Sequence, residues 1–167
     1  MRRPTPEKGQ IVVRNPERIG PKHPERRSKL DSGDCARECT GMMMTLTLVA
    51  LGGAIGASLR FLWGVGVIRL LGPMEFPLAI LSANVLGSFL MGVFVVAAAF
   101  RGLTPMSPFV MTGLLGGFTT FSAFSLETMT LIERGAIGQA AVYVGASVLV
   151  SIGALALGLW LARAVFA

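Results

Sequence analysis

The chain has very little charge after its first forty-one residues, and this scarcity excludes a soluble fold for most of it. Residues 1–41 contain ten of the fifteen Lys and Arg residues and six of the nine acidic residues. Five basic and three acidic residues remain for positions 42–167. A soluble surface needs many more charges, so this part of the chain must face lipid or a partner.

Cysteine and histidine are also scarce, which argues against disulfides and zinc sites. The two cysteines, Cys35 and Cys39, have a C-x-x-x-C spacing, and His23 is the only histidine. A zinc site would need further ligands, and this spacing matches no strong pattern. We expect both cysteines to be reduced and incidental. No nucleophile–base pair or metal-ligand set is recognisable, so we expect no enzyme activity.

Aromatic residues are missing from the basic tail formed by residues 1–41. Nucleic-acid binding would need stacking side chains or a known reader motif, and we expect none. The tail is rich in Pro, Arg, Glu, Gly and Ser, a composition that predicts disorder. The apolar stretch that follows is too long for a secretory signal. A second start at Met42–Met44 would remove the tail, and both starts remain open.

Four long apolar stretches occupy the rest of the chain. They cover about 44–71, 76–100, 106–132 and 136–165. About 20 apolar residues suffice to cross ~30 Å of hydrocarbon, whereas barrel strands are about half as long and alternate in polarity. We therefore predict an all-α protein with four transmembrane helices, forming one domain over residues 42–167 in a lipid bilayer.

The few charges near these stretches show little bias between the two sides of the membrane. They belong to Arg60, Arg69, Glu75, Arg101, Glu133, Arg134 and Arg163. So weak a positive-inside signal permits insertion in both directions, and hence an antiparallel dimer with its two-fold axis in the membrane plane. The basic tail, where translated, would instead favour a cytoplasmic N-terminus.

The centre of the third stretch contains residues that disfavour a helix. It reads Gly116-Gly117-Phe118-Thr119-Thr120-Phe121-Ser122. Adjacent glycines and β-branched threonines lower helix propensity, so we predict a third helix that is broken at its centre. Freed backbone at this depth must be buried in protein, bind an ion or line a wet cavity. An intact helix with a glycine packing contact is the alternative.

Neutral donors and aromatic rings lie on and around this segment. Phe121 and Phe124 share a helix face, and phenylalanine ring edges are electropositive. Asn84 is costly in hydrocarbon, and its NH2 group could donate to an anion. Such uncharged groups suit a small anion that must lose its water and still leave.

Hydroxyl groups repeat along the fourth stretch. Tyr143, Ser147 and Ser151 are four residues apart and form one stripe. Each serine could instead bond to a carbonyl of its own helix. Proton relays usually need an intramembrane carboxylate, and the nearest candidate is Glu127, two turns beyond the predicted break.

Three segments resemble the fluoride channels of the CrcB/Fluc family. They are residues 52–61, 84–92 and 116–125, which occur in the family's order on three separate spans. The resemblance extends over residues 52–163 and leaves out the tail. It implies a fluoride-selective channel that passively exports fluoride and lowers its cytoplasmic concentration. It also implies a prokaryotic plasma or inner membrane and a dual-topology antiparallel homodimer.

The resemblance also implies roles for individual residues. The expected fluoride path consists of Asn84, Phe121, Phe124, Ser122, Tyr143, Ser147 and Ser151. A structural Na⁺ would lie at the dimer centre, bound by the backbone carbonyls of Gly116 and Thr119 from each subunit. Arg60 matches the arginine of the family's first span, and Glu127 matches an acid near the pore mouth.

The chain departs from the family pattern before Asn84. Family members usually have Gly-Thr where this chain has Ala79 and Ile80, and Phe61 replaces a common Tyr. The missing hydroxyl leaves a heterodimer of unlike homologous subunits as an alternative. A small multidrug/proton antiporter would need a glutamate in the first span, which has none over 44–71. A non-transporting scaffold, in which the tail is the working part, is the third alternative.

Overall fold

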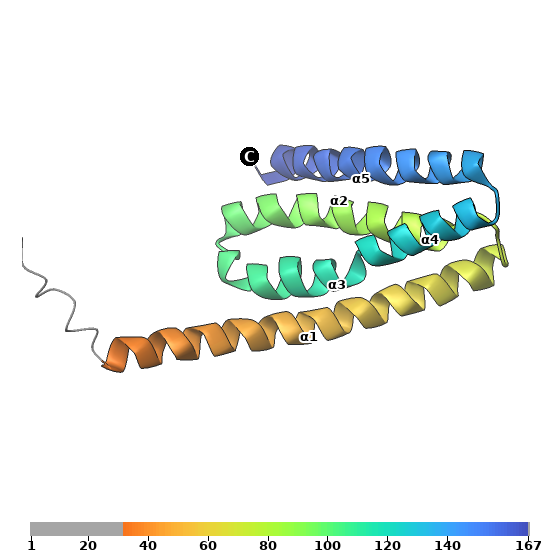
Figure 1. Cartoon of the computed structure of the whole chain (residues 1–167). Coiled ribbons are helices and arrows are strands. Elements are labelled where there is room, and N and C mark those ends of the chain that lie inside the picture. The colour runs from red at the N-terminus through yellow and green to blue at the C-terminus, as the bar shows by residue number, and fades with distance from the viewer. Residues whose placement is uncertain (1–31, 167) are drawn as a thin grey trace, which may run out of the picture. The chain divides into compact units, whose positions relative to one another are not determined.

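A computed structural model describes residues 32–166, and every regular element in this range is a helix. In chain order the helices are α1 (Ser32–Leu71), α2 (Leu78–Arg101), η3 (Thr104–Met106), η4 (Pro108–Leu115), α3 (Gly116–Phe118), α4 (Phe121–Glu133) and α5 (Ile137–Phe166) (Figure 1). Four segments are long and apolar enough to cross a membrane: Cys39–Leu71, Leu78–Arg101, Thr104–Glu133 and Ile137–Phe166. The prediction of four transmembrane helices in a multi-pass membrane protein is therefore confirmed.

The first helix begins earlier than expected. It starts at Ser32 rather than near Met44, and residues 1–31 of the predicted tail lie outside the described range. No proline occurs between Pro24 and Pro73, so the helix meets no residue that would break it. Contacts divide the chain after Glu38, and the packing described below concerns residues 39–166. At the start of the first span, Cys39 is an exposed free thiol.

Short turns reverse the chain between the spans. Gly102 ends α2 with φ 67°, a left-handed conformation that glycine adopts without strain, and its neighbour's N–H closes onto Ala98 O. Gly72 and Gly135 have positive φ in the same way after α1 and α4. Because these connections are short, consecutive spans run antiparallel.

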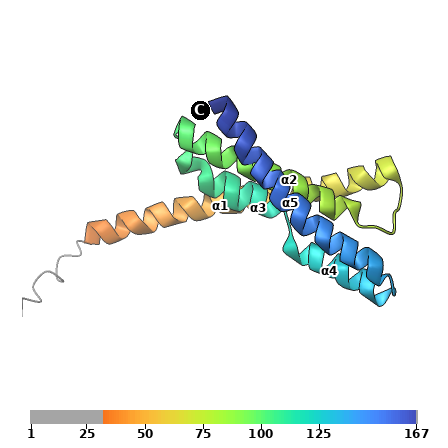
Figure 2. The same ribbon diagram turned by 90° about the horizontal axis from the view of Figure 1, so that it is seen from above.

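Glycines bring α2 and α5 into close contact along their length (Figures 1 and 2). A Cβ atom on Gly92 would lie under 3.0 Å from Leu155 O, and one on Gly158 would lie under 3.0 Å from Phe89 O. Small residues let helix backbones approach where lipid offers no hydrophobic drive for association. Any larger side chain at these two positions would push the helices apart.

Glycines play the same part between α1 and the third span. A Cβ atom on Gly117 would lie 2.8 Å from Gly53 O, and one on Gly113 would lie 2.8 Å from Gly52 Cα. The segment of the third span that packs here includes η4, a π-helix over Pro108–Leu115. π-Helical turns are rare, and the sequence pattern does not predict this one.

The third span bends between α3 and α4 (Figure 2). Thr119 (φ −83°, ψ 151°) and Thr120 (φ −151°, ψ 122°) have extended backbones, whereas Gly116 is helical with φ −64° and ψ −35°. The extended residues are thus the two threonines of the predicted segment, whereas its two glycines stay helical. Gly117 is held in the helix and packs against α1.

Candidate functional site

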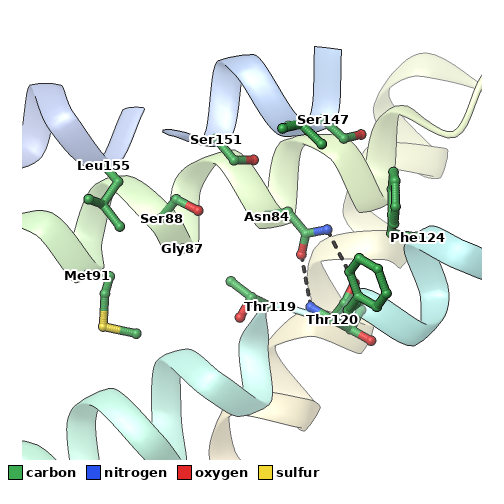
Figure 3. Close-up of a pocket in the computed structure, with 12 residues that line it drawn as sticks. Asn84, Gly87, Ser88, Met91, Thr119, Thr120, Phe124, Ser147, Ser151 and Leu155 are labelled. Atoms are coloured by element: carbon green, nitrogen blue, oxygen red, sulfur yellow. Dashed lines mark hydrogen bonds between the residues drawn. The ribbon is translucent and has the colours of Figure 1, made fainter. Parts of the chain in front are cut away.

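A cavity of about 340 Å³ lies beside the bend, between α2, the third span and α5 (Figure 3). Its lining residues carry no formal charge: Asn84, Gly87, Ser88, Met91, Thr119, Thr120, Phe121, Phe124, Ser147, Val148, Ser151 and Leu155. Polar groups and aromatic rings therefore meet in one uncharged space within membrane-spanning segments.

Asn84 of α2 lines the cavity and is hydrogen-bonded to the bend. Its Oδ1 atom accepts from Thr120 N–H at 2.9 Å, and its Nδ2 atom donates to Thr120 O at 3.3 Å (Figure 3). The side-chain amide thus pairs with both backbone groups of an extended residue that no helix ladder satisfies. The amide group has two N–H bonds, so one donor remains for the cavity.

Hydroxyl groups close both ends of the bend. Thr119 donates to Leu115 O through its N–H and through Oγ1, each at 2.9 Å. Thr120 Oγ1 accepts from Ala123 N–H at 3.3 Å and so caps the N-terminus of α4. Thr120 Oγ1 also lies 3.0 Å from Ser122 Oγ.

These side-chain bonds release two specific backbone carbonyls. In a continuous helix, Thr120 N–H would donate to Gly116 O and Ala123 N–H would donate to Thr119 O. Here Asn84 Oδ1 and Thr120 Oγ1 accept those two protons instead. Gly116 O and Thr119 O are neutral oxygen donors of the type that hard cations bind, so the residues present fit the Na⁺ ligand set expected for the family.

Aromatic rings form a continuous row that begins with two rings of the cavity lining and extends away from it. The centroids of Phe121 and Phe124 are 5.4 Å apart with planes tilted by 41°, and Phe124 is 5.4 Å from Tyr143. Tyr143 in turn meets Phe76 in an edge-to-face contact at 5.7 Å. The site therefore includes ring edges as well as hydroxyl groups.

Hydroxyl groups of α5 face this region without partners. Ser147 is only 6% exposed, Tyr143 is fully buried, and Ser151 is half-buried. In the described part of the chain, none of their three hydroxyl groups has a partner with the distance and angles of a full hydrogen bond, although the Tyr143 and Ser147 side chains, one turn apart, are close enough to interact weakly. The alternative that these serines bond to their own helix is therefore not observed. An unpaired buried hydroxyl is costly, which points to a polar ligand or water beside α5.

The cavity collects only part of the expected set. Asn84, Phe121, Phe124, Ser147 and Ser151 line it together with Thr119. Other expected residues lie outside its lining, namely Ser122, Tyr143, Gly116, Arg60 and Glu127.

Two of the residues outside the lining still support it. Tyr143 packs behind Phe124, and Ser122 reaches the cavity only through its contact with Thr120. Ile80, at the position of the missing hydroxyl, also lies outside the cavity lining. Its apolar side chain therefore takes no space within it.

Several lining residues were not singled out from the sequence. Ser88 and Met91 lie one and two turns beyond Asn84 on α2, and Leu155 lies one turn beyond Ser151 on α5. Helical spacing from the two polar residues would have found them. The role of Thr120 as a backbone partner depends on how α2 and the third span align, which local spacing does not reveal.

Comparison with known proteins shows the family of the chain. The profile of the family described as CrcB-like protein, Camphor Resistance (CrcB), matches residues 47–159. A protein of Ruegeria sp. (strain TM1040), named Fluoride-specific ion channel FluC, is 67% identical over 74% of this chain and 98% of its own length. Proteins with the same name from Roseobacter denitrificans and Caulobacter vibrioides are 67% and 51% identical, over 74% and 75% of this chain and 99% and 100% of their own lengths. This chain belongs to the CrcB family.

Proposed function

We propose that the chain is a fluoride-selective ion channel that passively exports fluoride and so lowers its cytoplasmic concentration. The observation that carries this proposal is the uncharged, mostly apolar cavity between membrane-spanning segments, in which the polar groups of Asn84, Ser147 and Ser151 meet phenylalanine rings. Neutral donors can replace the water around a small anion without trapping it, as a fixed cation would. The names of the relatives, Fluoride-specific ion channel FluC, support the choice of anion.

The donors for fluoride come from three elements. The second N–H of Asn84 and the unpartnered hydroxyl groups of Ser147 and Ser151 border the cavity from α2 and α5. The first turn of α4 adds backbone N–H groups at Phe121 and Ser122, which a helix N-terminus leaves without intrahelical acceptors. The ring edges of Phe121 and Phe124 complete the proposed path. Tyr143 supports it from behind Phe124.

We propose that the working unit is an antiparallel, dual-topology dimer. Phe121 lines the cavity yet is 79% exposed in the single chain, so a second subunit would be needed to enclose the path at this ring. Among the charges next to the spans, Arg69 and Arg134 lie at one membrane face and Arg101 and Arg163 at the other. This balance favours no orientation for residues 39–166.

The proposed dimer would hold Na⁺ at its centre through Gly116 O and Thr119 O of each subunit. When bound, the ion would supply a positive charge that neutralises the converging carbonyl dipoles of the two chains. Arg60 and Glu127 would provide vestibule or structural charges on α1 and α4. The second proposed assembly is a heterodimer with a homologous subunit. Ile80 stands where the family usually has a hydroxyl-bearing residue, so both subunits of a homodimer would lack that hydroxyl group.

Fluoride release from vesicles tests the proposal directly. The purified protein, reconstituted alone, should release trapped fluoride to a fluoride-selective electrode without a proton gradient, and chloride should remain inside. A requirement for a proton gradient would instead indicate an antiporter. Fluoride that stays trapped with folded protein would refute the homodimeric channel. Release that appears only after a homologous subunit is added would establish the heterodimer.

A further inference from the structure

The bend of the third span depends on a hydrogen bond from outside that span. Thr120 N–H has two possible acceptors: Gly116 O in a continuous helix, and Asn84 Oδ1 of α2, to which it donates at 2.9 Å. One proton cannot serve both acceptors well, so the side chain of α2 competes with the helix. While Asn84 holds this proton, Gly116 O has no helix donor.

Two further observations show that α2 holds the bend tightly. Asn84 Nδ2 donates to Thr120 O at 3.3 Å, so the amide grips both backbone groups of the same residue. Gly87, nearly one turn further along α2, is so close to Thr119 that an added Cβ would lie under 3.0 Å from Thr119 Cγ2. Both extended residues are thus positioned by one face of α2.

We propose that Asn84 is a positioning residue for the central cation: by accepting Thr120 N–H, it keeps Gly116 O free to bind Na⁺. This inference rests on the cation site of the proposed function and adds a role for Asn84 apart from contact with fluoride. Loss of the Oδ1 acceptor lets Thr120 N–H return to Gly116 O. The carbonyl then receives a hydrogen bond where it would bind the ion.

Two substitutions separate this role from fluoride contact. Asn84→Leu has a similar shape but neither donor nor acceptor, so it should abolish the effect of Na⁺ on Gly116. Asn84→Asp keeps an oxygen for Thr120 N–H but puts a carboxyl group beside the anion path. It should therefore retain the Na⁺ effect while fluoride efflux falls. Ser88→Ala, one turn along the same cavity wall, is the matched control and should leave the Na⁺ effect intact.

The carbonyl itself can be observed. In NMR spectra of protein labelled only in glycine, with ¹³C at the carbonyl and ¹⁵N at the amide, a one-bond ¹³C–¹⁵N correlation requires two consecutive glycines. The chain has two such pairs, 52–53 and 116–117. Gly53→Ala removes the first pair, and its added Cβ meets nothing within 4 Å, so the remaining signal reports Gly116. Spectra of the reconstituted protein are compared in NaCl and in choline chloride. The unfolding midpoint of each variant is measured in the same two salts.

We expect the Gly116 carbonyl shift to respond to Na⁺ in the parent protein, Asn84→Asp and Ser88→Ala, and not in Asn84→Leu. The unfolding midpoint should rise in Na⁺ for the same three proteins only. A response that persists in folded Asn84→Leu would overturn the inference. Where Asn84→Leu does not fold, Asn84→Ala gives the same comparison.

Failure of the inference can be told apart from failure of the proposed function. Absence of any Na⁺ response in the parent protein would refute the cation site, and the inference with it. Absence of fluoride efflux from the parent protein would refute the proposed channel. The carbonyl measurement would still decide whether Asn84 keeps Gly116 O free for Na⁺. A lost Na⁺ response in Asn84→Asp would show that the acceptor oxygen is not what matters, and would also overturn the inference.

Discussion

Gly87→Ala should disturb the bend through one added methyl group. The new Cβ would lie under 3.0 Å from Thr119 Cγ2 and 3.2 Å from Phe118 Cδ1. Ordinary contact begins at 3.4 Å, so Thr119 must move away from α2 by more than 0.4 Å. The Asn84 Nδ2–Thr120 O distance, now 3.3 Å, would then reach about 3.7 Å, too long for a hydrogen bond.

The energetic cost follows from these contacts. Overpacking lowers stability by about 1–3 kcal/mol, whereas the higher helix propensity of alanine than of glycine raises it by about 1 kcal/mol. Turning the Thr119 methyl away would break the bond from Oγ1 to Leu115 O, which also costs about 1 kcal/mol. We therefore expect a loss of about 1–3 kcal/mol in stability. Fluoride efflux should fall at least about fivefold where that energy is lost from the conducting state.

A second substitution tests the cause. Thr119→Ser removes the clashing methyl and keeps the hydroxyl, so the double variant Gly87→Ala/Thr119→Ser should regain most of the efflux and stability. Gly138→Ala on α5, whose Cβ would meet nothing within 4 Å, is the control. The assays are fluoride-electrode efflux and thermal unfolding in detergent. A double variant no better than Gly87→Ala alone would refute the steric reasoning.

Three further predictions concern the rings and the helix contacts. Phe121→Ile and Phe124→Ile should each reduce fluoride efflux at least ~10-fold, because they remove electropositive ring edges. Size-exclusion chromatography should show that assembly is intact. Unchanged efflux in both variants would show that the rings do not take part in the fluoride path. Gly158→Ala should destabilise the protein by about 1–3 kcal/mol, whereas Gly153→Ala should not, because an added Cβ at Gly153 would meet open space. Equal unfolding midpoints of the two variants would contradict the packing described for α2 and α5. Trp63→Phe should cost about 1 kcal/mol by losing the indole hydrogen bond to α2 at 3.0 Å, as measured by thermal unfolding, and no change would show that this bond is not needed.

Hydropathy was enough to locate the spans, because crossing hydrocarbon demands a length and polarity that are visible in any window of the sequence. The predicted second and fourth spans, 76–100 and 136–165, end within two residues of the observed helices. The start of α1 was less predictable, since the helix continues past the apolar stretch into polar residues.

The bend was harder to place from sequence. Low helix propensity pointed to the whole segment from Gly116 to Thr120, but Gly116 and Gly117 are helical, and Gly117 packs closely against Gly53 of α1. Thr120 is extended where Asn84 satisfies both of its backbone groups, and Asn84 is 36 residues away in the chain. Local propensity cannot anticipate a partner so distant.

The even number of crossings gives the native protein its own orientation probe. Four spans return the chain to the face of the membrane on which Cys39 lies, so Phe166 ends at that same face. The other cysteine of the chain, Cys35, precedes the first span as well. A membrane-impermeant maleimide applied to intact cells therefore reaches a thiol only in molecules whose two ends are outside. In an antiparallel population about half of the chains would be labelled, without any engineered cysteine.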